Sequence, residues 1–474
     1  MSRLVIISNR APSVDGASDS GGLVVALKDA LSKRGGLWIG SAPAASEDPS
    51  QSIIMHERSD FDIGLFELEP QLQRDFYLGY SNSVLWPAFH GRLDLIDVQP
   101  DYIRAYREVS KRVARMVAKV IGDDDVIWIH DYQLIPLAHE LKKAGLTNRI
   151  GFFLHIPLPD LQTFRAIPEW KDIAGWLASY DVIGFQAKRD VAHLIDIFRH
   201  TLNGELRFNG NMSIDGKEIS LGCFPISIDV QGFAAMAAET SRKVEPPALP
   251  RLIGVDRLDY SKGLPQRLAG YEHFLESNPG YHCKVSLLQI APPSRDDVEA
   301  YKEIRAELEA ITGRINGRFG TVDWVPLHYI HRSLPRNELA ALYRYSRLAL
   351  VTPLFDGMNL VAKEYVAAQD SADPGVLLLS QFAGAAEEMK EALIINPHDP
   401  QGLAKAIRRG LEMPLEERRE RHEALYKRLA DNDVSKWSET FIKQLELPVS
   451  TPAPEAMPIN LDRRARPLMQ PQHR

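Results

Sequence analysis

Val-Asp-Arg-Leu-Asp-Tyr-Ser-Lys-Gly, at positions 255–263, decides the expected fold together with Asp-Gly-Met-Asn-Leu-Val-Ala-Lys-Glu, at positions 356–364. Each stretch follows an apolar run of strand length, at residues 252–255 and 348–351. Polar residues directly after buried strands are typical of open α/β sheets, which bind ligands beyond the carboxyl ends of their strands. Both stretches are therefore expected at such a sheet edge.

The chemistry expected at this edge is the binding of a polyanion. Arg257 and Lys262 supply two cations, and a helix is predicted to begin just after Gly357. A helix N-terminus carries free N–H groups and a partial positive charge, so together with two cations it favours a diphosphate. Glu364 lies about two turns into that helix, from where it can reach back toward a ribose. Each cation alone is equally well explained as a surface charge, but the two stretches together favour a site.

Strand-like apolar runs alternate with helical patterns along the chain, which favours parallel sheets with right-handed crossovers. The predicted strands lie at residues 4–8, 126–129, 150–154, 182–185, 219–224, 252–255, 284–290, 348–352, 376–379 and 393–395. The segment 244–250 contains three prolines, which resist any regular element, and it divides the strands into two sets. The sequence therefore predicts an α/β protein with two doubly wound, Rossmann-like domains.

The domain boundaries follow from this division. Residues 1–235 are expected to form the first domain and residues 236–448 the second, with a last helix at about 434–445. Residues 449–474 are rich in proline and arginine and poor in large apolar groups, which predicts a disordered tail.

Composition limits the possible partners. The 474 residues carry a net charge of −7, which argues against a general nucleic-acid binder, and no apolar run approaches the ~20 residues of a membrane span. The apolar run within residues 1–10 is too short for a signal peptide and is expected to be a strand. Cys223 and Cys283, the only cysteines, are expected to be reduced core residues, as in a cytoplasmic protein.

In this order, the two stretches resemble those of the retaining sugar-nucleotide glycosyltransferases of the trehalose-6-phosphate synthase family, and the resemblance covers roughly residues 1–440. It implies the GT-B arrangement, in which an acceptor-binding domain and a nucleotide-sugar-binding domain face a deep cleft and the last helix crosses back to the first domain. It also implies transfer of glucose from UDP-glucose to glucose 6-phosphate, giving α,α-trehalose 6-phosphate, the first step of trehalose biosynthesis.

For the donor, the resemblance implies that Arg257 and Lys262 stabilise the diphosphate as its bond to glucose breaks. Asp356 would hold hydroxyl groups of the donor glucose, and Glu364 would hold the ribose. The other implied donor-binding positions are Gly21, Gly22, Leu334, Asn359, Leu360 and Val361. By itself the glycine pair is better explained as a plain turn, and it is not the G-x-G-x-x-G fingerprint of a dinucleotide cofactor.

For the acceptor, the resemblance implies that Arg10 and Arg295 clamp the phosphate from opposite domains. Tyr77 and Trp86 would line the pocket of the acceptor sugar. Planar charge-assisted contacts suit this role, because an arginine presents a fork of donors to a phosphate. Such a two-sided clamp would couple acceptor binding to closure of the cleft.

Asp131 and His155 each lie at the end of a predicted strand, where sites of α/β proteins are built. The resemblance implies that Asp131 accepts a hydrogen bond from an acceptor hydroxyl and that His155 sits beside the donor glucose. The groups expected around the reacting atoms are therefore Asp131, His155, Arg257, Lys262 and Asp356.

No metal or other cofactor is expected. Many glycosyltransferases hold a divalent ion on an Asp-x-Asp pair, and this chain has such pairs at positions 60/62, 123/125 and 431/433. None of them follows a predicted strand, so they are interpreted as turn and helix-cap residues. Fixed cations and a helix dipole would then stabilise the leaving group.

Three alternatives stay open. Related enzymes use glycerol 3-phosphate as acceptor or couple cyclitol units, and a non-catalytic sugar-phosphate sensor could share the fold. One departure from the family is Phe355, at a position where arginine is common, and this change could alter donor preference. The residues leave the oligomeric state undecided; a homodimer or homotetramer is the expectation.

Overall fold

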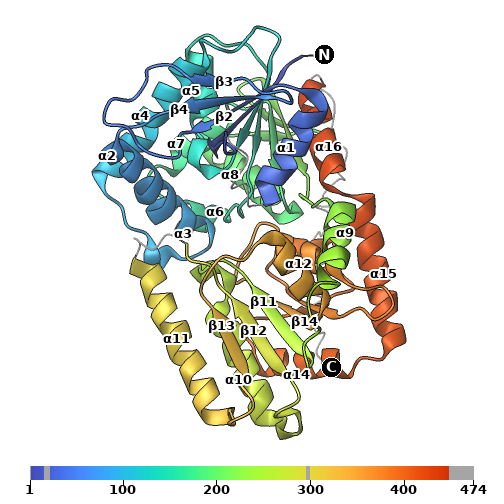
Figure 1. The fold of residues 1–474 in the computed structure, drawn as a ribbon. Helices are drawn as coiled ribbons and strands as arrows, with labels where there is room; N and C mark the ends of the chain where they lie inside the picture. Colours follow the sequence, from blue (N-terminus) through green and yellow to red (C-terminus); the bar gives the residue numbers. More distant parts are fainter. Residues whose placement is uncertain (1, 15–21, 295–298, 448–474) are drawn as a thin grey trace, which may run out of the picture.

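The computed structural model describes residues 2–14, 22–294 and 299–447. These residues form two α/β units stacked one on the other (Figure 1). The expectations for Gly21, Arg295 and residues 449–474 lie outside the described residues.

The first unit holds a sheet whose described strands run in the order β3-β4-β2-β1-β5-β6-β7-β10-β9-β8. From β4 to β10 neighbouring strands are parallel, and the pairs involving β3, β8 and β9 at the edges are antiparallel. The bounds are β1 Leu4–Arg10, β2 Leu37–Ser41, β3 Ile54–His56, β4 Asp62–Phe66, β5 Val126–His130, β6 Ile150–Phe153, β7 Val182–Phe185, β8 Glu205–Leu206, β9 Met212–Ile214 and β10 Lys217–Cys223.

The second unit holds a parallel sheet in the order β13-β12-β11-β14-β15-β16. Its strands are β11 Arg251–Val255, β12 Ser286–Ile290, β13 Leu327–Ile330, β14 Ser346–Val351, β15 Val376–Ser380 and β16 Leu393–Ile395. Two mostly parallel sheets, each with helices around it, confirm the predicted pair of doubly wound domains.

The helices between the strands complete both units (Figure 1). In the first unit and the connection after it they are α1 Gly22–Arg34, α2 Pro70–Gln73, α3 Trp86–Phe89, α4 Pro100–Val117, α5 Leu137–Lys143, α6 Leu161–Phe164, α7 Trp170–Leu177, α8 Lys188–Leu202 and α9 Val230–Ser241. The others are α10 Leu264–Ser277, α11 Glu299–Phe319, α12 Arg336–Arg344, α13 Leu360–Ala368, α14 Pro400–Glu412, α15 Leu415–Asp431 and α16 Val434–Glu446.

The predicted strands are all present, because strands buried on both faces read as continuous apolar runs. All five residues of β5, for example, are buried. The sequence did not predict β2, β3, β4, β8, β9 and β13. Several of these are short strands at or near the sheet edges, and β3 and β13 are partly exposed, whereas β2 is buried and apolar and was still missed.

The chain crosses between the two units twice. Residues 224–229 lead from β10 to α9, which packs against α12 and α13 of the second unit. The turn before α16 leads back, and α16 returns to the first sheet (Figure 1). There Phe441 stacks on Trp128 with ring centroids 4.5 Å apart. A Cβ on Gly184 would lie 2.7 Å from the Phe441 ring, so the strand needs glycine beneath this helix.

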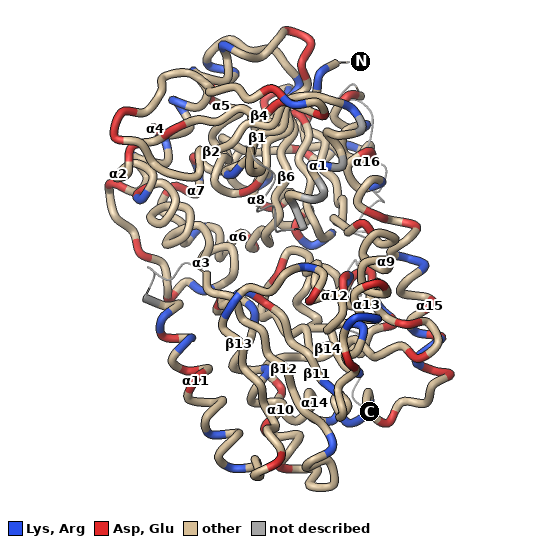
Figure 2. Tube along the Cα trace, in the orientation of Figure 1, with Lys and Arg blue, Asp and Glu red and all other residues tan. Residues whose placement is uncertain are grey.

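The cysteine prediction was wrong for one residue. Cys283 is exposed, with φ of 59°, because it lies in the turn before β12 and not in the strand. Cys223 is partly buried at the end of β10, where its thiol lies 3.5 Å from the carbonyl oxygen of Gln186, and neither of the two described cysteines forms a disulfide. On the outside of the molecule, Lys and Arg alternate with Asp and Glu along α11 and α15, so neither helix presents a single sign of charge (Figure 2).

Candidate active site

A cavity of about 560 Å³ lies between the two units. One wall is the π-helix η1 (Arg74–Leu85), which contributes Asn82 and Ser83, and the other is formed by Tyr260 and Ala300. Asn82 and Ser83 donate side-chain hydrogen bonds to the carbonyl groups five residues earlier, which supports the wide helical turn. π-helical turns are rare and frequently occur at functional sites.

The two decisive stretches meet at the carboxyl edge of the second sheet. Lys262 Nζ lies 2.6 Å from Oδ2 of Asp356, and Asn359 donates to the same oxygen at 3.1 Å. Burial acts to raise the pKa of Asp356, but the charge of Lys262 and these hydrogen bonds outweigh it, so its pKa is lowered. Asp356 is therefore a buried, negatively charged carboxylate that forms an ion pair with Lys262.

The helix expected after Gly357 is α13, and its start is unusual. Asn359 has φ of 95°, and its side chain caps the helix by accepting from the N–H of Ala362. A non-glycine residue with such a φ is uncommon, and strained residues of this kind cluster at functional sites. Leu360 and Val361 form the first turn of α13 and are partly buried.

Two cation–π contacts join predicted site residues in pairs. The Arg257 guanidinium lies 5.9 Å from the ring centre of Trp86, so a residue of the second unit faces one of the first. Arg10, at the end of β1, lies 5.5 Å from the ring centre of Tyr77 on η1. Trp86 is 4% exposed and belongs to the hydrophobic core, so only part of its ring is free to line a pocket.

Asp131 and His155 are neighbours, as expected for residues that follow adjacent strands β5 and β6. Asp131 has φ of 72°, and its carboxylate accepts a hydrogen bond from the N–H of His155 at 3.2 Å. A Cβ on Gly357 would lie 2.2 Å from the carbonyl oxygen of His155. The main chain of His155 is therefore held between Asp131 and the stretch that precedes α13.

The ring of His155 belongs to a buried chain of polar groups. Its Nε2 lies 3.0 Å from Nδ1 of His130, and its Nδ1 lies 3.2 Å from Nε2 of Gln186. Burial lowers the pKa of His155 to about 3 and that of His130 well below its usual value. Both rings are therefore neutral near pH 7.

Glu364 lies on α13 and is paired with Arg336, with 3.6 Å between the charged atoms. Burial raises the pKa of Glu364 to about 7, although Arg336 acts in the opposite direction. Leu334, predicted to contact the base, is partly buried just before α12. Gly22 is the first residue of α1.

Sequence reasoning missed several residues at the interface of the two units. Arg189 donates to the carbonyl of Asp356 at 2.6 Å and lies 4.8 Å from the ring centre of Phe355. Gln186 and Arg189 follow β7, so the rule that sites lie beyond the carboxyl ends of strands would have found them. His90 is also buried here, and burial lowers its pKa to about 4, with Lys262 and Asp356 as charged neighbours.

The Asp-x-Asp pairs have structural partners. Asp433 caps α16 by accepting from the N–H of Lys436, and Asp125 forms an ion pair with Arg3 at 2.6 Å. Asp60 accepts from the N–H of Phe61, while Asp62 opens β4. Among the described residues, no group of three or more His, Cys, Asp or Glu side chains is arranged to hold a metal ion. None of the described helices is long and apolar enough to cross a membrane.

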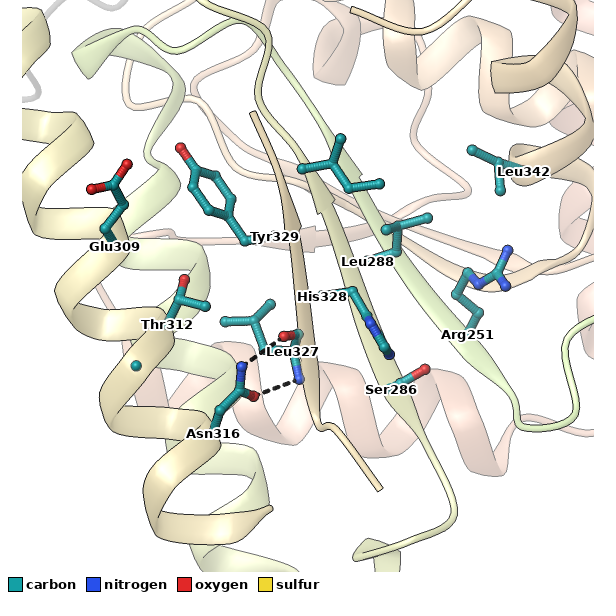
Figure 3. A pocket seen from close by; sticks show the side chains of 12 residues that line it. Arg251, Ser286, Leu288, Glu309, Thr312, Asn316, Leu327, His328, Tyr329 and Leu342 are labelled. Carbon is teal, nitrogen blue, oxygen red and sulfur yellow. Dashed lines mark hydrogen bonds between the residues drawn. The ribbon is translucent and has the colours of Figure 1, made fainter. Parts of the chain in front are cut away.

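A larger cavity, of about 730 Å³, lies away from these residues at the edge strand β13 (Figure 3). Tyr329, Thr312 and Asn316 lie on its α11 side, and Arg251 and His328 lie on the other. Arg251 opens β11, so this side faces the amino ends of the strands. None of the predicted site residues within the described ranges lines this cavity, and none lines the cavity of about 560 Å³ between the units.

The comparisons with known proteins agree with one another. The profile of glycosyltransferase family 20 matches residues 4–447. A trehalose-6-phosphate synthase from Enterobacter sp. (strain 638) is 45% identical over 459 residues, covering 94% of this chain and 95% of the relative.

Solved structures extend the likeness to three dimensions. A UDP-forming α,α-trehalose-phosphate synthase from Burkholderia xenovorans, in complex with glucose-6-phosphate, is 41% identical with a TM-score of 0.88 and covers 94% of this chain and all of its own. An E. coli structure bound with UDP-2-fluoro glucose is 43% identical with a TM-score of 0.89, covering 94% of this chain and 99% of its own. Fold, sequence and the meeting of the two stretches at one edge thus lead to the same conclusion: the chain belongs to glycosyltransferase family 20.

Proposed function

We propose that the chain transfers glucose from UDP-glucose to glucose 6-phosphate, giving α,α-trehalose 6-phosphate and UDP. The observation that carries this proposal is the meeting of Lys262, Asp356 and the start of α13 at one sheet edge, with Arg257 facing Trp86 of the first unit. The relatives support it, because one of the similar structures is bound with UDP-2-fluoro glucose and another is in complex with glucose-6-phosphate.

In the reaction, the bond between C1 of the donor glucose and the diphosphate oxygen breaks, and a bond from C1 to O1 of glucose 6-phosphate forms. We assign Arg257, Lys262 and the N–H groups at the start of α13 to the leaving diphosphate, whose negative charge grows as the bond breaks. Losing one such preorganised donor typically costs about 3 kcal/mol in the transition state. The acceptor proton moves to the leaving phosphate, and configuration at C1 is retained.

For the donor we assign Asp356 to the glucose hydroxyls and Glu364 to the ribose. Their environments support this: Asp356 is a buried carboxylate beside Lys262, and Glu364 lies near the start of α13. Leu334, Leu360, Val361 and the glycine pair are proposed to lie along the donor.

For the acceptor we assign Arg10 and Tyr77 to the phosphate side of the pocket, with Arg295 as a second clamp. The contact between the Arg10 guanidinium and the Tyr77 ring supports a shared role. Asp131 is proposed to accept from an acceptor hydroxyl, and His155 to lie beside the donor glucose. In this scheme residues 1–235 bind the acceptor and residues 236–448 bind the nucleotide sugar, without a metal.

The test is UDP release from UDP-glucose in the presence of chelator, with glucose 6-phosphate or glycerol 3-phosphate as acceptor. We expect release only with glucose 6-phosphate, together with a non-reducing disaccharide phosphate. Release with glycerol 3-phosphate alone would make the chain a glucosylglycerol-phosphate synthase. Absence of release with every nucleotide sugar tried would make it a sensor.

We further propose a cytoplasmic location and a homodimer or homotetramer. Cys223 and Cys283, both within the described residues, form no disulfide, which supports a reducing compartment. Light scattering during size-exclusion chromatography would give the mass of the assembly, and a mass of one chain would contradict the oligomer.

A further inference from the structure

Gln186 connects His155 to the point where the chain first crosses between the units. Its Oε1 accepts from the main-chain N–H of Ile226 at 2.9 Å, and its Nε2 lies 3.2 Å from Nδ1 of His155. Gln186 is 2% exposed. Ile226 belongs to the crossing segment, residues 224–229, which leads from β10 to α9.

These two contacts determine the orientation of the Gln186 amide. A main-chain N–H only donates, so the side-chain atom that faces Ile226 must be the oxygen. The atom that faces His155 is then the NH₂ group, which donates to Nδ1. Since His155 is neutral, its proton lies on Nε2 and is donated to Nδ1 of His130.

The crossing segment is tied to both units. Lys363, on α13, donates to the carbonyl of Ile226 at 2.6 Å and forms an ion pair with Glu388. The second crossing lies beside the first, because Trp437 donates to the carbonyl of Phe224 at 3.1 Å. A continuous set of hydrogen bonds thus runs from α13 through Ile226 and Gln186 to His155.

His155 is the residue at which this set reaches the substrate-binding elements. Its N–H donates to Asp131, and its carbonyl oxygen lies so near Gly357 that a Cβ on Gly357 would be 2.2 Å away. The direction of its ring and the position of its main chain therefore affect the acceptor side and the donor side together.

We propose that Gln186 is a positioning residue: it holds His155 as the Nε2–H tautomer and ties it to the crossing segment. This inference rests on the proposed function for the role of His155, but not for the tautomer itself. A displacement of about 1 Å at a reacting centre can cost 100-fold in rate. Loss of the Gln186 contact is therefore expected to lower kcat and to leave the KM of both substrates nearly unchanged.

The direct test is the ¹⁵N chemical shift of the His155 ring nitrogens, by NMR of the full chain labelled at histidine and assigned with His155→Gln. In the wild type we expect an unprotonated Nδ1 and a protonated Nε2. Gln186→Glu places a carboxylate oxygen, which only accepts, against Nδ1. The proton should then move to Nδ1, and kcat should fall by up to about 100-fold.

Gln369 provides a matched control. It is also buried, its Oε1 accepts from the N–H of Gly375, and its Nε2 donates to the carbonyl of Tyr343. Gln369→Glu should lower thermal stability as Gln186→Glu does, but should leave the His155 shifts and kcat unchanged.

A protonated Nδ1 in the wild type would overturn the proposal, and so would unchanged ring shifts in Gln186→Glu at a pH where the new carboxyl group is ionised and can only accept. An equal loss of kcat in Gln369→Glu would reduce Gln186 to a structural role. If the wild type releases no UDP from any donor, the proposed function fails, while the ring shifts still decide the tautomer.

Discussion

Gly357 of the second unit approaches His155 of the first so closely that a Cβ on Gly357 would lie 2.2 Å from the His155 carbonyl oxygen. The stretch that precedes α13 and the end of β6 thus meet main chain to main chain. This contact sets the distance between the proposed donor side and the proposed acceptor side, and it leads to the first prediction.

Gly357→Ala is expected to lower activity strongly because the added methyl group must push the two units apart. Displacements of about 1 Å at a reacting centre can cost 100-fold in rate. The measurement is kcat/KM for UDP release, with the unfolding temperature followed in parallel. Gly175→Ala is the control, since a Cβ there meets no atom within 4 Å. Wild-type turnover in Gly357→Ala would show that the contact opens during the reaction.

Lys262→Ala is expected to lower kcat by about 100- to 1,000-fold, because the preorganised cation that we propose for the leaving diphosphate is lost. It also leaves Asp356 without its ion-pair partner, so the pKa of Asp356 should rise. Asp356→Asn in the same background removes the unpaired charge and should restore stability without restoring kcat. Restored kcat in the double variant would place the Lys262 effect in folding and not in the reaction.

Arg189→Met is expected to raise the KM for UDP-glucose, because the guanidinium that holds the Asp356 carbonyl from the opposite unit is lost. The KM for glucose 6-phosphate should change much less. Steady-state kinetics with each substrate varied in turn separates the two constants. Arg347→Met, which removes a partly exposed pair with Asp373, should change neither. Equal increases in both KM values would contradict a donor-side role of Arg189.

Glu364 makes stability depend on pH. Its folded pKa, raised by burial from 4.5 to about 7, exceeds the unfolded value, so the folded state binds more protons between these limits. The contribution of Glu364 to the free energy of unfolding is therefore fully present below about pH 4.5. It falls by roughly 3 kcal/mol as the pH rises to about 7. Chemical unfolding of the wild type and Glu364→Gln across this range measures the free energy of unfolding of each. The variant should be the more stable protein near pH 7, and the difference between the two free energies should shrink at low pH.

UDP binding gives a second measurement at Glu364. A ribose hydroxyl that donates to the carboxylate favours its charged form, so binding near pH 6.5 should release protons. Calorimetry in two buffers of different ionisation enthalpy counts them. Proton release that persists in Glu364→Gln would assign the effect to another group.

Much of the fold and of the site could be predicted from local patterns. Fully buried strands such as β5 and β14 read as apolar runs, and the polar residues after them mark the sheet edge. Edge strands such as β3 and β13 gave no such signal, since their side chains are partly exposed. Cys283 was misplaced for a related reason: it lies in a turn that directly precedes an apolar strand.

What the sequence by itself determined is a set of groups and the strands that present them: Arg257, Lys262 and the start of α13 follow from their places after buried apolar runs, and Asp356 follows from the resemblance to the family. Only the tertiary structure decided which groups face one another across the two units. The contacts of Gln186 with His155, of Arg189 with Asp356, and of Arg257 with Trp86 join residues far apart in the chain. Periodicity records which face of an element is buried, but not which distant element covers it; packing between the two units makes that choice.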